Sequence, residues 1–518
     1  MKKMRRFAAI AAAAMTACMA VPMMGMMTAS AESITIEGIG TEAHTFEVYQ
    51  VFTGTLENGK LTALKWGSGV SAYNGSPVTD DSAVSDTDAA AFTALTDARD
   101  VIDMVTLSTT KACEDVVSSG PSVTIDGLTA GYYIVKDITN FTDKDDANSA
   151  WIVQVATSNT TVSIKNAKPA VDKQIQDETT DAEDGATNGW GESADHAINE
   201  KFQFKLTATI PANSTNLKYY DTYKMVFQDD LSAGVTFDQI DSVTVNGQNV
   251  TYTETATTAT EKAGLAWSLT IDDVIQPVKD AGGTWGTTAV EVVVTYTAHL
   301  NEEAIVSGQN VTNGGVADVE NNMVYLQYSN NPDNTGGGEL GKTEKDYVWA
   351  FTYKAENTKV SNTENGAKLA GAVFELTDAD GNIVKLIDNE DGTYTVADQT
   401  ATSGVVTELT SNSVGKFDII GLDAGTYTLT ETDAPEGYNI CEPVTFTITA
   451  THKEVAGTAV NMTLNGDATP SNTIINKEGA SLPSTGGIGT TLFYVIGGTL
   501  AAGAGVALIA KKRMKNEE

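Results

Sequence analysis

The body of this chain is built from short segments in which apolar and polar residues alternate, and this pattern restricts the fold more than any other feature. Examples are residues 45–52, 132–135 and 292–296. Successive side chains of a β-strand point to opposite faces, so alternation is typical of strands with one buried face. Turn-forming Gly, Asn, Asp and Ser residues lie between the segments. The sequence therefore predicts an all-β chain of tandem immunoglobulin-like β-sandwich domains.

One stretch departs from the strand pattern. Residues 86–107 are rich in Ala and contain neither Gly nor Pro, so we expect a small helical insertion in the first domain. Asp-Gly pairs at 380–381 and 391–392 predict tight hairpins in a later domain. Residues 378–381 partly fit a calcium-binding loop, but the glycine comes too early and the closing glutamate is missing. We therefore interpret them as a turn and expect no metal site.

Two breaks divide the body into three domains. A proline follows a polar cluster at residues 166–169, and an Asn- and Gly-rich run occupies residues 331–341. We expect an N-terminal domain at 32–166, a second domain at 167–341 and a third at 342–478.

The two ends of the chain carry apolar segments of different kinds. Residues 1–6 are basic, an apolar stretch follows, and small residues end at Ala31. This order predicts a secretory signal peptide cleaved after Ala31. Near the other end, an apolar run at 492–510 is long enough for a transmembrane helix, and a basic tail at 511–513 would stay in the cytoplasm. We expect the residues between these segments to lie outside the cell.

A five-residue box precedes the apolar run. It consists of Leu482, Pro483, Ser484, Thr485 and Gly486. A plain membrane anchor would need no such box. The order of box, apolar span and basic tail at residues 479–518 resembles the LPxTG cell-wall sorting signal that sortases of Gram-positive bacteria recognise. The resemblance implies that a sortase cleaves between Thr485 and Gly486 and passes the Thr485 acyl group to an amine.

Composition excludes several classes of function. The net charge is −36, which argues against nucleic acid as a partner, because phosphate binding needs a basic surface. Four dispersed histidines argue against a zinc site or a catalytic triad. The mature chain keeps only Cys113 and Cys441, which fall in different domains and are expected to be unpaired small buried residues. We expect no cofactor, no metal and no enzymatic activity on other molecules.

Three polar groups of the third domain occupy positions where apolar residues are expected. Alternation from Trp349 through Phe351 and Tyr353 brings Lys359 to an inward face, and the same reasoning applies to Glu431 and Asn476. Burial lowers the pKa of a lysine and raises that of a carboxylic acid. A neutral amine can then attack the asparagine carboxamide, with the acid relaying protons as ammonia leaves. The expected product is an intramolecular isopeptide bond.

The motifs around these residues identify a family. Residues 369–374 (Leu-Ala-Gly-Ala-x-Phe) and 430–438 (Thr-Glu-Thr-x-Ala-Pro-x-Gly-Tyr) resemble CNA-B-type domains of Gram-positive pilins and adhesins. The resemblance implies a Lys359–Asn476 bond with Glu431 as the catalytic acid.

The second domain has a parallel set. Lys173, Asp229 and Asn330 each share a face with apolar neighbours. Residues 226–235 and 328–332 resemble the second domain of fimbrial backbone subunits, which implies a Lys173–Asn330 bond assisted by Asp229. Asn331 and Asp230 remain alternatives.

A backbone pilin also needs an acceptor lysine for the next subunit. The family's acceptor lies in a Tyr-Pro-Lys-Asn segment, and this chain has Lys165-Asn166 in that place without the Tyr and Pro. We expect Lys165 to be the acceptor, with Lys168 as the alternative.

The resemblance as a whole implies a structural backbone pilin. Its expected partners are pilin-class and housekeeping sortases, further copies of itself, minor pilins and peptidoglycan, and the sequence leaves a host ligand open. The alternatives are a monomeric wall-anchored adhesin and, without any supporting constellation, a surface hydrolase.

Overall fold

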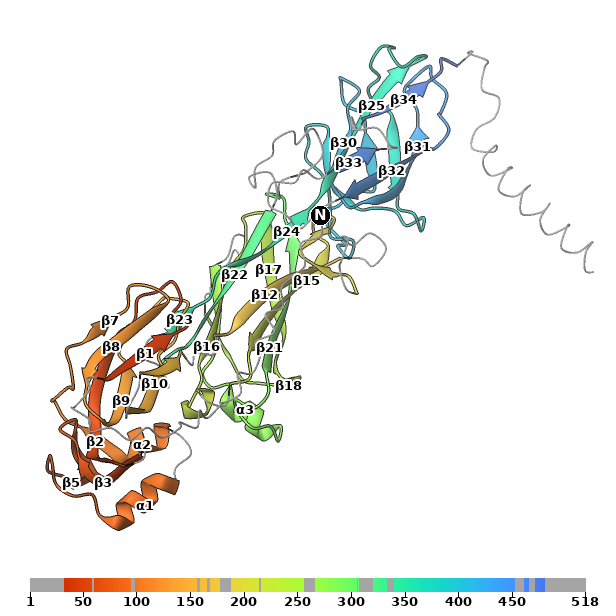
Figure 1. Cartoon of the computed structure of the whole chain (residues 1–518). Helices are drawn as coiled ribbons and strands as arrows, with labels where there is room; N and C mark the ends of the chain where they lie inside the picture. The colour runs from red at the N-terminus through yellow and green to blue at the C-terminus, as the bar shows by residue number, and fades with distance from the viewer. Residues whose placement is uncertain are drawn as a thin grey trace, which may run out of the picture. The chain divides into compact units, whose positions relative to one another are not determined.

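The computed structural model describes most of the chain between the two terminal segments (Figure 1). The described residues are 32–57, 60–94, 98–155, 159–164, 168–177, 188–213, 216–255, 266–304, 306, 320–332, 340–451, 461–464 and 471–479. The signal-peptide, sorting-box and membrane-span predictions lie outside these ranges. In the part of the chain that is described, no helix is long and apolar enough to cross a membrane.

The chain forms two compact units. The described residues up to Ala194, with Lys201–His299 and Glu320–Trp349, form the first unit. The second unit holds Asp195–Glu200, the described residues of 300–319, and those from Ala350 onward.

The N-terminal part of the first unit is a β-sandwich, as predicted. One sheet has the strand order β11-β1-β8, and the other has β10-β9-β2-β3 with β7 paired to β2. The core between them includes Ile34 from one sheet and Phe46 and Trp151 from the other. The bounds are β1 (Glu32–Glu37), β2 (Thr45–Glu57), β3 (Lys60–Trp66), β7 (Val116–Val117), β8 (Ser122–Leu128), β9 (Gly131–Asp137), β10 (Ala150–Val155) and β11 (Thr160–Ser163).

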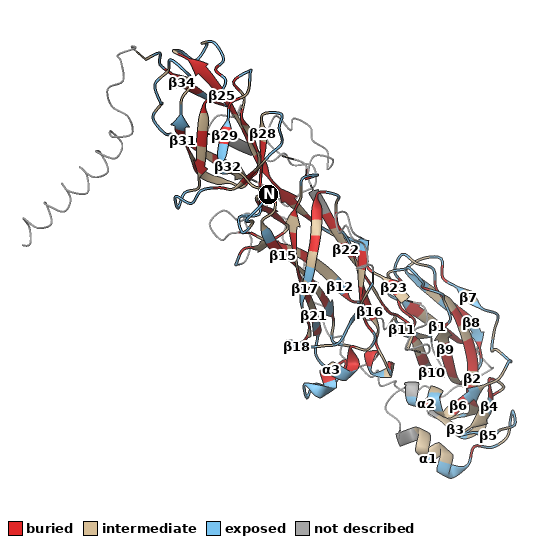
Figure 2. Cartoon of the chain, turned by 180° about the vertical axis from the view of Figure 1, so that it is seen from behind, coloured by how far each residue is buried: buried red, intermediate tan, exposed pale blue. Residues whose placement is uncertain are grey.

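The helical insertion is confirmed for most of its predicted length. It forms α1 (Asp86–Ala94) and α2 (Ala98–Met104), whereas Val105–Leu107 is strand β6. β6 joins β4 (Val70–Tyr73) and β5 (Ser76–Pro77) in a small sheet. A β-branched pair, Val105 and Thr106, favours a strand here. In Figure 2 the residues of α1 whose burial is described are exposed or half-buried, whereas the strands of the sandwich carry buried residues.

The second sandwich completes the first unit. Its sheets have the orders β13-β12-β15-β21-β17-β18 and β14-β24-β22-β16-β20-β19, with β23 paired to β22. The bounds of the first sheet are β12 (Ala170–Gln176), β13 (Trp190–Gly191), β15 (Lys201–Ile210), β17 (Val235–Val245), β18 (Gln248–Asn249) and β21 (Val290–Leu300). Those of the second are β14 (Ser193–Asp195), β16 (Met225–Asp230), β19 (Thr253–Thr255), β20 (Ala266–Ile271), β22 (Glu320–Ser329), β23 (Leu340–Lys342) and β24 (Asp346–Phe351). Two short helices, η1 (Leu217–Tyr219) and α3 (Ile275–Asp280), connect strands.

The segment 346–351 differs from its prediction. We expected Trp349 to alternate inward with Phe351 and Tyr353 on one opening strand of the third domain. Instead, β24 belongs to the second sandwich's sheet and ends before Thr352. Its buried residues are Val348, Ala350 and Phe351, and Trp349 is only half-buried. The interruption at Thr352 shifts the alternation, so the inward parity of β24 does not continue that of the next strand.

The third sandwich forms the body of the second unit. One sheet has the order β27-β28-β30-β25-β34 and the other β29-β26-β31-β32-β33. The bounds of the first are β25 (Tyr353–Ser361), β27 (Leu386–Asp388), β28 (Thr393–Val396), β30 (Asp418–Leu422) and β34 (Ser471–Asn476). Those of the second are β26 (Val373–Thr377), β29 (Glu408–Thr410), β31 (Gly425–Asp433), β32 (Val444–Thr451) and β33 (Asn461–Leu464).

Both predicted turns of this sandwich are present. β27 and β28 pair as an antiparallel hairpin around Gly392, which has φ +92°. Thr377 and Ile383 bridge around Gly381, which has φ +82°. In the second turn the Asp378 carboxylate accepts hydrogen bonds from the backbone of Asp380 and Asn382. Its oxygens therefore stabilise the turn, in agreement with the turn interpretation of this segment.

Candidate functional site

The first and last strands of the third sandwich bring two predicted site residues together. β25 and β34 run parallel and side by side (Figure 1), with Lys359 opposite Ile474 and Ser361 opposite Asn476. Glu431 comes from β31 in the facing sheet. All three polar residues are buried, with Lys359 0%, Asn476 1% and Glu431 4% exposed. Buried ionisable groups of this kind need partners, and these three supply them to one another.

The contacts form a closed triangle. Lys359 Nζ donates a hydrogen bond to Asn476 Oδ1. Glu431 Oε1 lies 3.3 Å from Lys359 Nζ and accepts a hydrogen bond of 2.8 Å from Asn476 Nδ2. One carboxylate oxygen thus contacts both the attacking nitrogen and the nitrogen that would leave. It is placed to take a proton from the first and deliver it to the second.

The surroundings hold this triangle in place. The backbone N–H of Cys441 donates to Glu431 Oε2 at 2.6 Å, which orients the carboxylate. Lys359 Nζ lies 5.3 Å from the centre of the Phe374 ring and 3.7 Å from Cys441 Sγ. Cys441 is half-buried and unpaired, and burial raises the pKa of its thiol to about 11. The thiol is therefore neutral at physiological pH and is a weak nucleophile.

The second sandwich contains a buried lysine–carboxyl pair. Lys173 of β12 and Asp229 of β16 are 0% and 2% exposed, and Lys173 Nζ lies 2.7 Å from Asp229 Oδ2. The Tyr296 hydroxyl donates to Asp229 Oδ1 at 3.2 Å. Burial lowers the pKa of Lys173 and raises the pKa of Asp229, because each charged form loses its hydration. Both shifts favour a neutral amine beside a protonated acid, the pairing that amide exchange requires.

Asn330 does not join this pair, so the predicted Lys173–Asn330 bond is wrong. Asp229 pairs with Val324 on β22, and Asn330 follows the end of that strand. Six residues of extended chain place Asn330 about 20 Å away along the strand. Its side-chain amide instead donates to the carbonyls of Phe141 and Asp146, at 3.1 and 3.2 Å. These residues belong to the loop after β9, so Asn330 ties the first sandwich's loop to the second sandwich.

The alternatives named for this bond do not fit either. Asp230 is exposed, and Asn331 lies one residue beyond Asn330, still farther from Asp229. Asp230 points to the opposite face of β16 from Asp229 because successive side chains of a strand alternate.

A different asparagine lies near Asp229. Asn322 is two residues from Val324 on β22 and faces the same way, so it is a diagonal neighbour of Asp229. The backbone N–H of Lys173 donates to Asp346, the first residue of β24, which runs beside β22. Asn322 is fully buried, and its Oδ1 accepts a hydrogen bond from the backbone N–H of Ser232.

The side-chain amide of Asn322 is only partly hydrogen-bonded, and Oδ1 of Asn330 is also without a partner among the described atoms. Among the described atoms, Nδ2 of Asn322 is buried without a hydrogen-bond partner, which is costly for an amide. The sequence already contained the signal, because Asn322 continues the alternation of Val324, Leu326 and Tyr328 towards the N-terminus. The other end of the same run is Asn330, to which the family resemblance pointed.

The structure describes one of the two lysines predicted as acceptors for the next subunit. Lys165 lies outside the described residues. Lys168 is exposed, and its Nζ donates to the Asp145 carbonyl at 2.8 Å and lies 3.1 Å from Asp145 Oδ2. The other carboxylate oxygen of Asp145 accepts a hydrogen bond of 3.0 Å from the Tyr328 hydroxyl.

The first sandwich has a buried histidine in place of a buried lysine. Among the described residues, Lys173 and Lys359 are the lysines that are buried. His44, at 0% exposure, has Nδ1 2.8 Å from Asp137 and Nε2 3.3 Å from Asp146. Burial lowers the pKa of His44, but the hydrogen bonds and negative charges of the two aspartates outweigh it and raise the pKa to about 9. Sequence reasoning missed this cluster because its three members are far apart in the chain.

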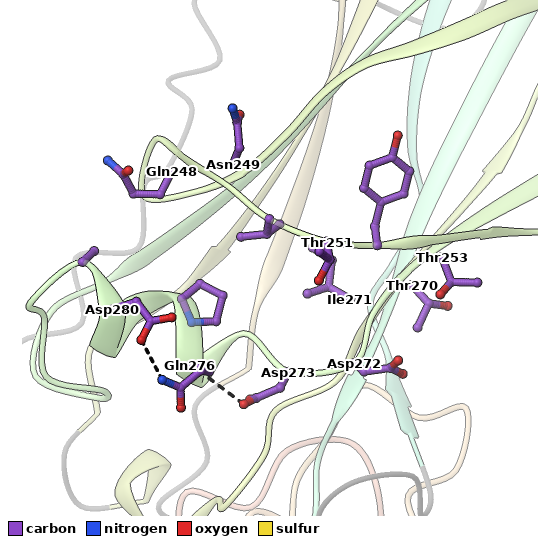
Figure 3. Close-up of a pocket in the computed structure, with 14 residues that line it drawn as sticks. Gln248, Asn249, Thr251, Thr253, Thr270, Ile271, Asp272, Asp273, Gln276 and Asp280 are labelled. Carbon is purple, nitrogen blue, oxygen red and sulfur yellow. Dashed lines mark hydrogen bonds between the residues drawn. The ribbon is translucent and has the colours of Figure 1, made fainter.

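A groove lies beside α3 in the second sandwich (Figure 3). It has a volume of about 620 Å³. Asp273 accepts a hydrogen bond from the Gln276 backbone, and the Gln276 side chain donates to Asp280. These groups mainly stabilise the helix and its connection, and we assign the groove no chemistry.

Two family models match parts of the second unit. Residues 474–518 match the family model of the LPXTG cell wall anchor motif. The C-terminus is an LPXTG cell wall anchor. The chain is therefore a sortase substrate whose body is anchored to the cell wall. Residues 354–463 match the family model of a prealbumin-like fold domain, which agrees with the sandwich that carries Lys359 and Glu431.

The chain was also compared with solved structures and with curated proteins. The major pilin SpaD of Corynebacterium diphtheriae is 16% identical, with 87% of this chain and 98% of that chain covered and a TM-score of 0.45. The RrgB pilus protein of Streptococcus pneumoniae is 15% identical, with 88% and 99% covered and a TM-score of 0.43. The major pilin subunit BcpA of Bacillus cereus is 15% identical, with 87% and 100% covered and a TM-score of 0.42. No curated protein matches the chain.

Proposed function

We propose that this protein is the structural backbone subunit of a covalently polymerised pilus on a Gram-positive cell surface. The observation that carries the proposal is the buried triangle of Lys359, Glu431 and Asn476, which joins the first and last strands of a sandwich. A covalent link at this position would let tension pass through the domain without unzipping its strands. Combined with a cell wall anchor, such a link suits a subunit that carries load.

The third sandwich would form its bond by amide exchange. The neutral Lys359 amine attacks Cγ of Asn476, so that the Nζ–Cγ bond forms as the Cγ–Nδ2 bond breaks. Glu431 takes the proton that the amine loses and delivers it to Nδ2, which leaves as ammonia.

In the second sandwich we propose a Lys173–Asn322 bond with Asp229 as the acid. This assignment replaces the Lys173–Asn330 bond that the family resemblance implied. The support is the position of Asn322 on the strand beside Asp229, together with its buried side-chain nitrogen. Tyr296 would hold the carboxyl group of Asp229 in place.

Intact-mass measurement of the segment Glu32–Gly479 tests the internal bonds. We expect a mass lower than the sequence mass by two ammonia molecules, with cross-linked peptides that join Lys359 to Asn476 and Lys173 to Asn322. The Asn322→Ala variant should lose one of the two shifts. The matched Asn330→Ala variant should keep both, because Asn330 contacts the first sandwich instead. An unshifted wild-type mass would refute the proposal, and loss of a shift in Asn330→Ala would refute the assignment to Asn322.

For polymerisation we propose that a pilin-class sortase joins Thr485 of one subunit to Lys165 or Lys168 of the next. Housekeeping sortase would finally attach the shaft to peptidoglycan. The competing function, a monomeric wall-anchored adhesin, would share the fold and the anchor and lack this linkage.

A further inference from the structure

The Lys359 and Asn476 side chains can react only if β25 and β34 pair in one particular register. The strands are parallel, with Asn357 opposite Asn472, Lys359 opposite Ile474 and Ser361 opposite Asn476. A slip of two residues would keep every side chain on its own face. It would move Asn476 by about 7 Å relative to Lys359. Alternation of polar and apolar residues alone therefore does not specify the reactive register.

A second buried polar pair lies on the same two strands. Asn357 is 0% exposed and Asn472 is 6% exposed. The side-chain nitrogen of Asn472 donates to Asn357 Oδ1 at 2.8 Å. This contact joins the two strands two residues before Lys359.

The amide of Asn357 is fully satisfied in this register. Its nitrogen donates to the carbonyls of Ala355 and Phe417, at 3.2 and 3.1 Å, while its oxygen accepts from Asn472. A slip in one direction would place Ile474 against Asn357 and leave the buried carbonyl oxygen without its donor. A slip in the other direction would bring Asn472 opposite Lys359. Either slip leaves a buried amide unpaired, which is unfavourable.

We propose that Asn357 and Asn472 form a register lock that positions Asn476 against Lys359 and prevents a bond to the wrong asparagine. Both are positioning residues, because neither contacts the reacting atoms. The inference rests on the proposed isopeptide bond of the third sandwich. In coiled coils, a single buried asparagine at a core position specifies register at some cost in stability.

The test follows bond formation in newly made Glu32–Gly479 by pulse labelling, intact mass and peptide mapping. The single variant Asn357→Leu removes the hydrogen-bond acceptor of Asn472 and retains Asn472 itself. Some chains should therefore carry a Lys359–Asn472 link. The double variant Asn357→Leu/Asn472→Leu replaces both amides by apolar groups of similar size and should remain folded. It should accumulate the Lys359–Asn476 bond at least about tenfold more slowly than wild type, because register is no longer specified.

Ser411→Ala provides the matched control. Ser411 is 2% exposed in the same sandwich, and its hydroxyl bonds the backbone of Leu369 and Ala372. This variant also loses buried hydrogen bonds but should form the bond at the wild-type rate. A folded double variant that closes only the Lys359–Asn476 bond at the wild-type rate would overturn the register lock. A wild-type chain without that bond would instead overturn the proposed function.

Discussion

At the residue scale, this protein accommodates buried ionisable side chains in two different ways. The second and third sandwiches each bury a lysine beside a carboxyl group, and in the third an asparagine completes a set that amide exchange can convert into a neutral covalent bond. The first sandwich buries His44 between Asp137 and Asp146. That cluster offers no carboxamide for a bond, so its contribution to stability is ionic and depends on pH.

The sign of this pH dependence follows from the pKa of His44. Its folded-state value of about 9 lies above the ordinary value of 6.5. The stabilisation is therefore fully present below about pH 6.5 and is lost as the pH rises through 9. A shift of this size corresponds to roughly 3 kcal/mol. We expect the urea midpoint of the first sandwich to fall between pH 6.5 and 9.

A pair of variants isolates the contribution of His44. His44→Gln should lower the midpoint at pH 6 and flatten its dependence on pH. His299→Gln is the control, because His299 pairs with Asp238 at a partly exposed position of β21. That variant should leave the pH dependence of the first sandwich's urea midpoint unchanged. A wild-type midpoint that stays constant from pH 6 to 9 would contradict the ionic role of His44.

At the scale of the elements, close backbone approaches restrict which residues the strands tolerate. Gly67 follows β3 and donates its N–H to the Val51 carbonyl on β2. A Cβ at this position would lie 2.4 Å from the Gln50 carbonyl oxygen. Because the obstructing atom belongs to the backbone of a paired strand, it cannot move aside without disturbing the sheet.

Substitution at Gly67 should therefore destabilise the first sandwich. We expect Gly67→Ala to cost roughly 1–3 kcal/mol, the range typical of overpacking, measured as a shift in its urea midpoint. Gly120 is the matched control, since a Cβ there would meet nothing within 4 Å. Gly120→Ala should be nearly neutral. Equal midpoints for the two variants would show that β2 and β3 can separate at little cost.

At the scale of the whole molecule, the proposed shaft depends on one acceptor lysine. Sheared surface extracts of producing cells should give a high-mass ladder that disappears in Thr485→Ala. One of the variants Lys165→Ala and Lys168→Ala should also abolish the ladder, while the other serves as its control. Since Lys168 interacts with Asp145, the measurement also tests whether a lysine held in this way can accept the acyl group. A single monomeric band in wild type would favour the adhesin.

The sequence was sufficient for the local features of the fold. Period-two alternation predicted the strands, Asp-Gly pairs predicted the hairpins, and the Ala-rich stretch predicted α1 and α2. It also identified Lys173, Asp229, Lys359, Glu431 and Asn476 as inward-facing polar residues, and all five are buried. These predictions succeed because alternation and turn preferences are properties of a few neighbouring residues.

The sequence could not decide which distant strands pair, or in which register they pair. Family resemblance chose Asn330 for Lys173, whereas the register of β16 and β22 places Val324 beside Asp229 and leaves Asn330 at the far end. Likewise, β24 ends before Thr352 and pairs within the second sandwich's sheet, not with the strands of the third. Alternation specifies the face of a residue but carries no information on its distance along a neighbouring strand. Only the tertiary pairing of strands far apart in the chain decides that distance, and with it the partner that a buried lysine can reach.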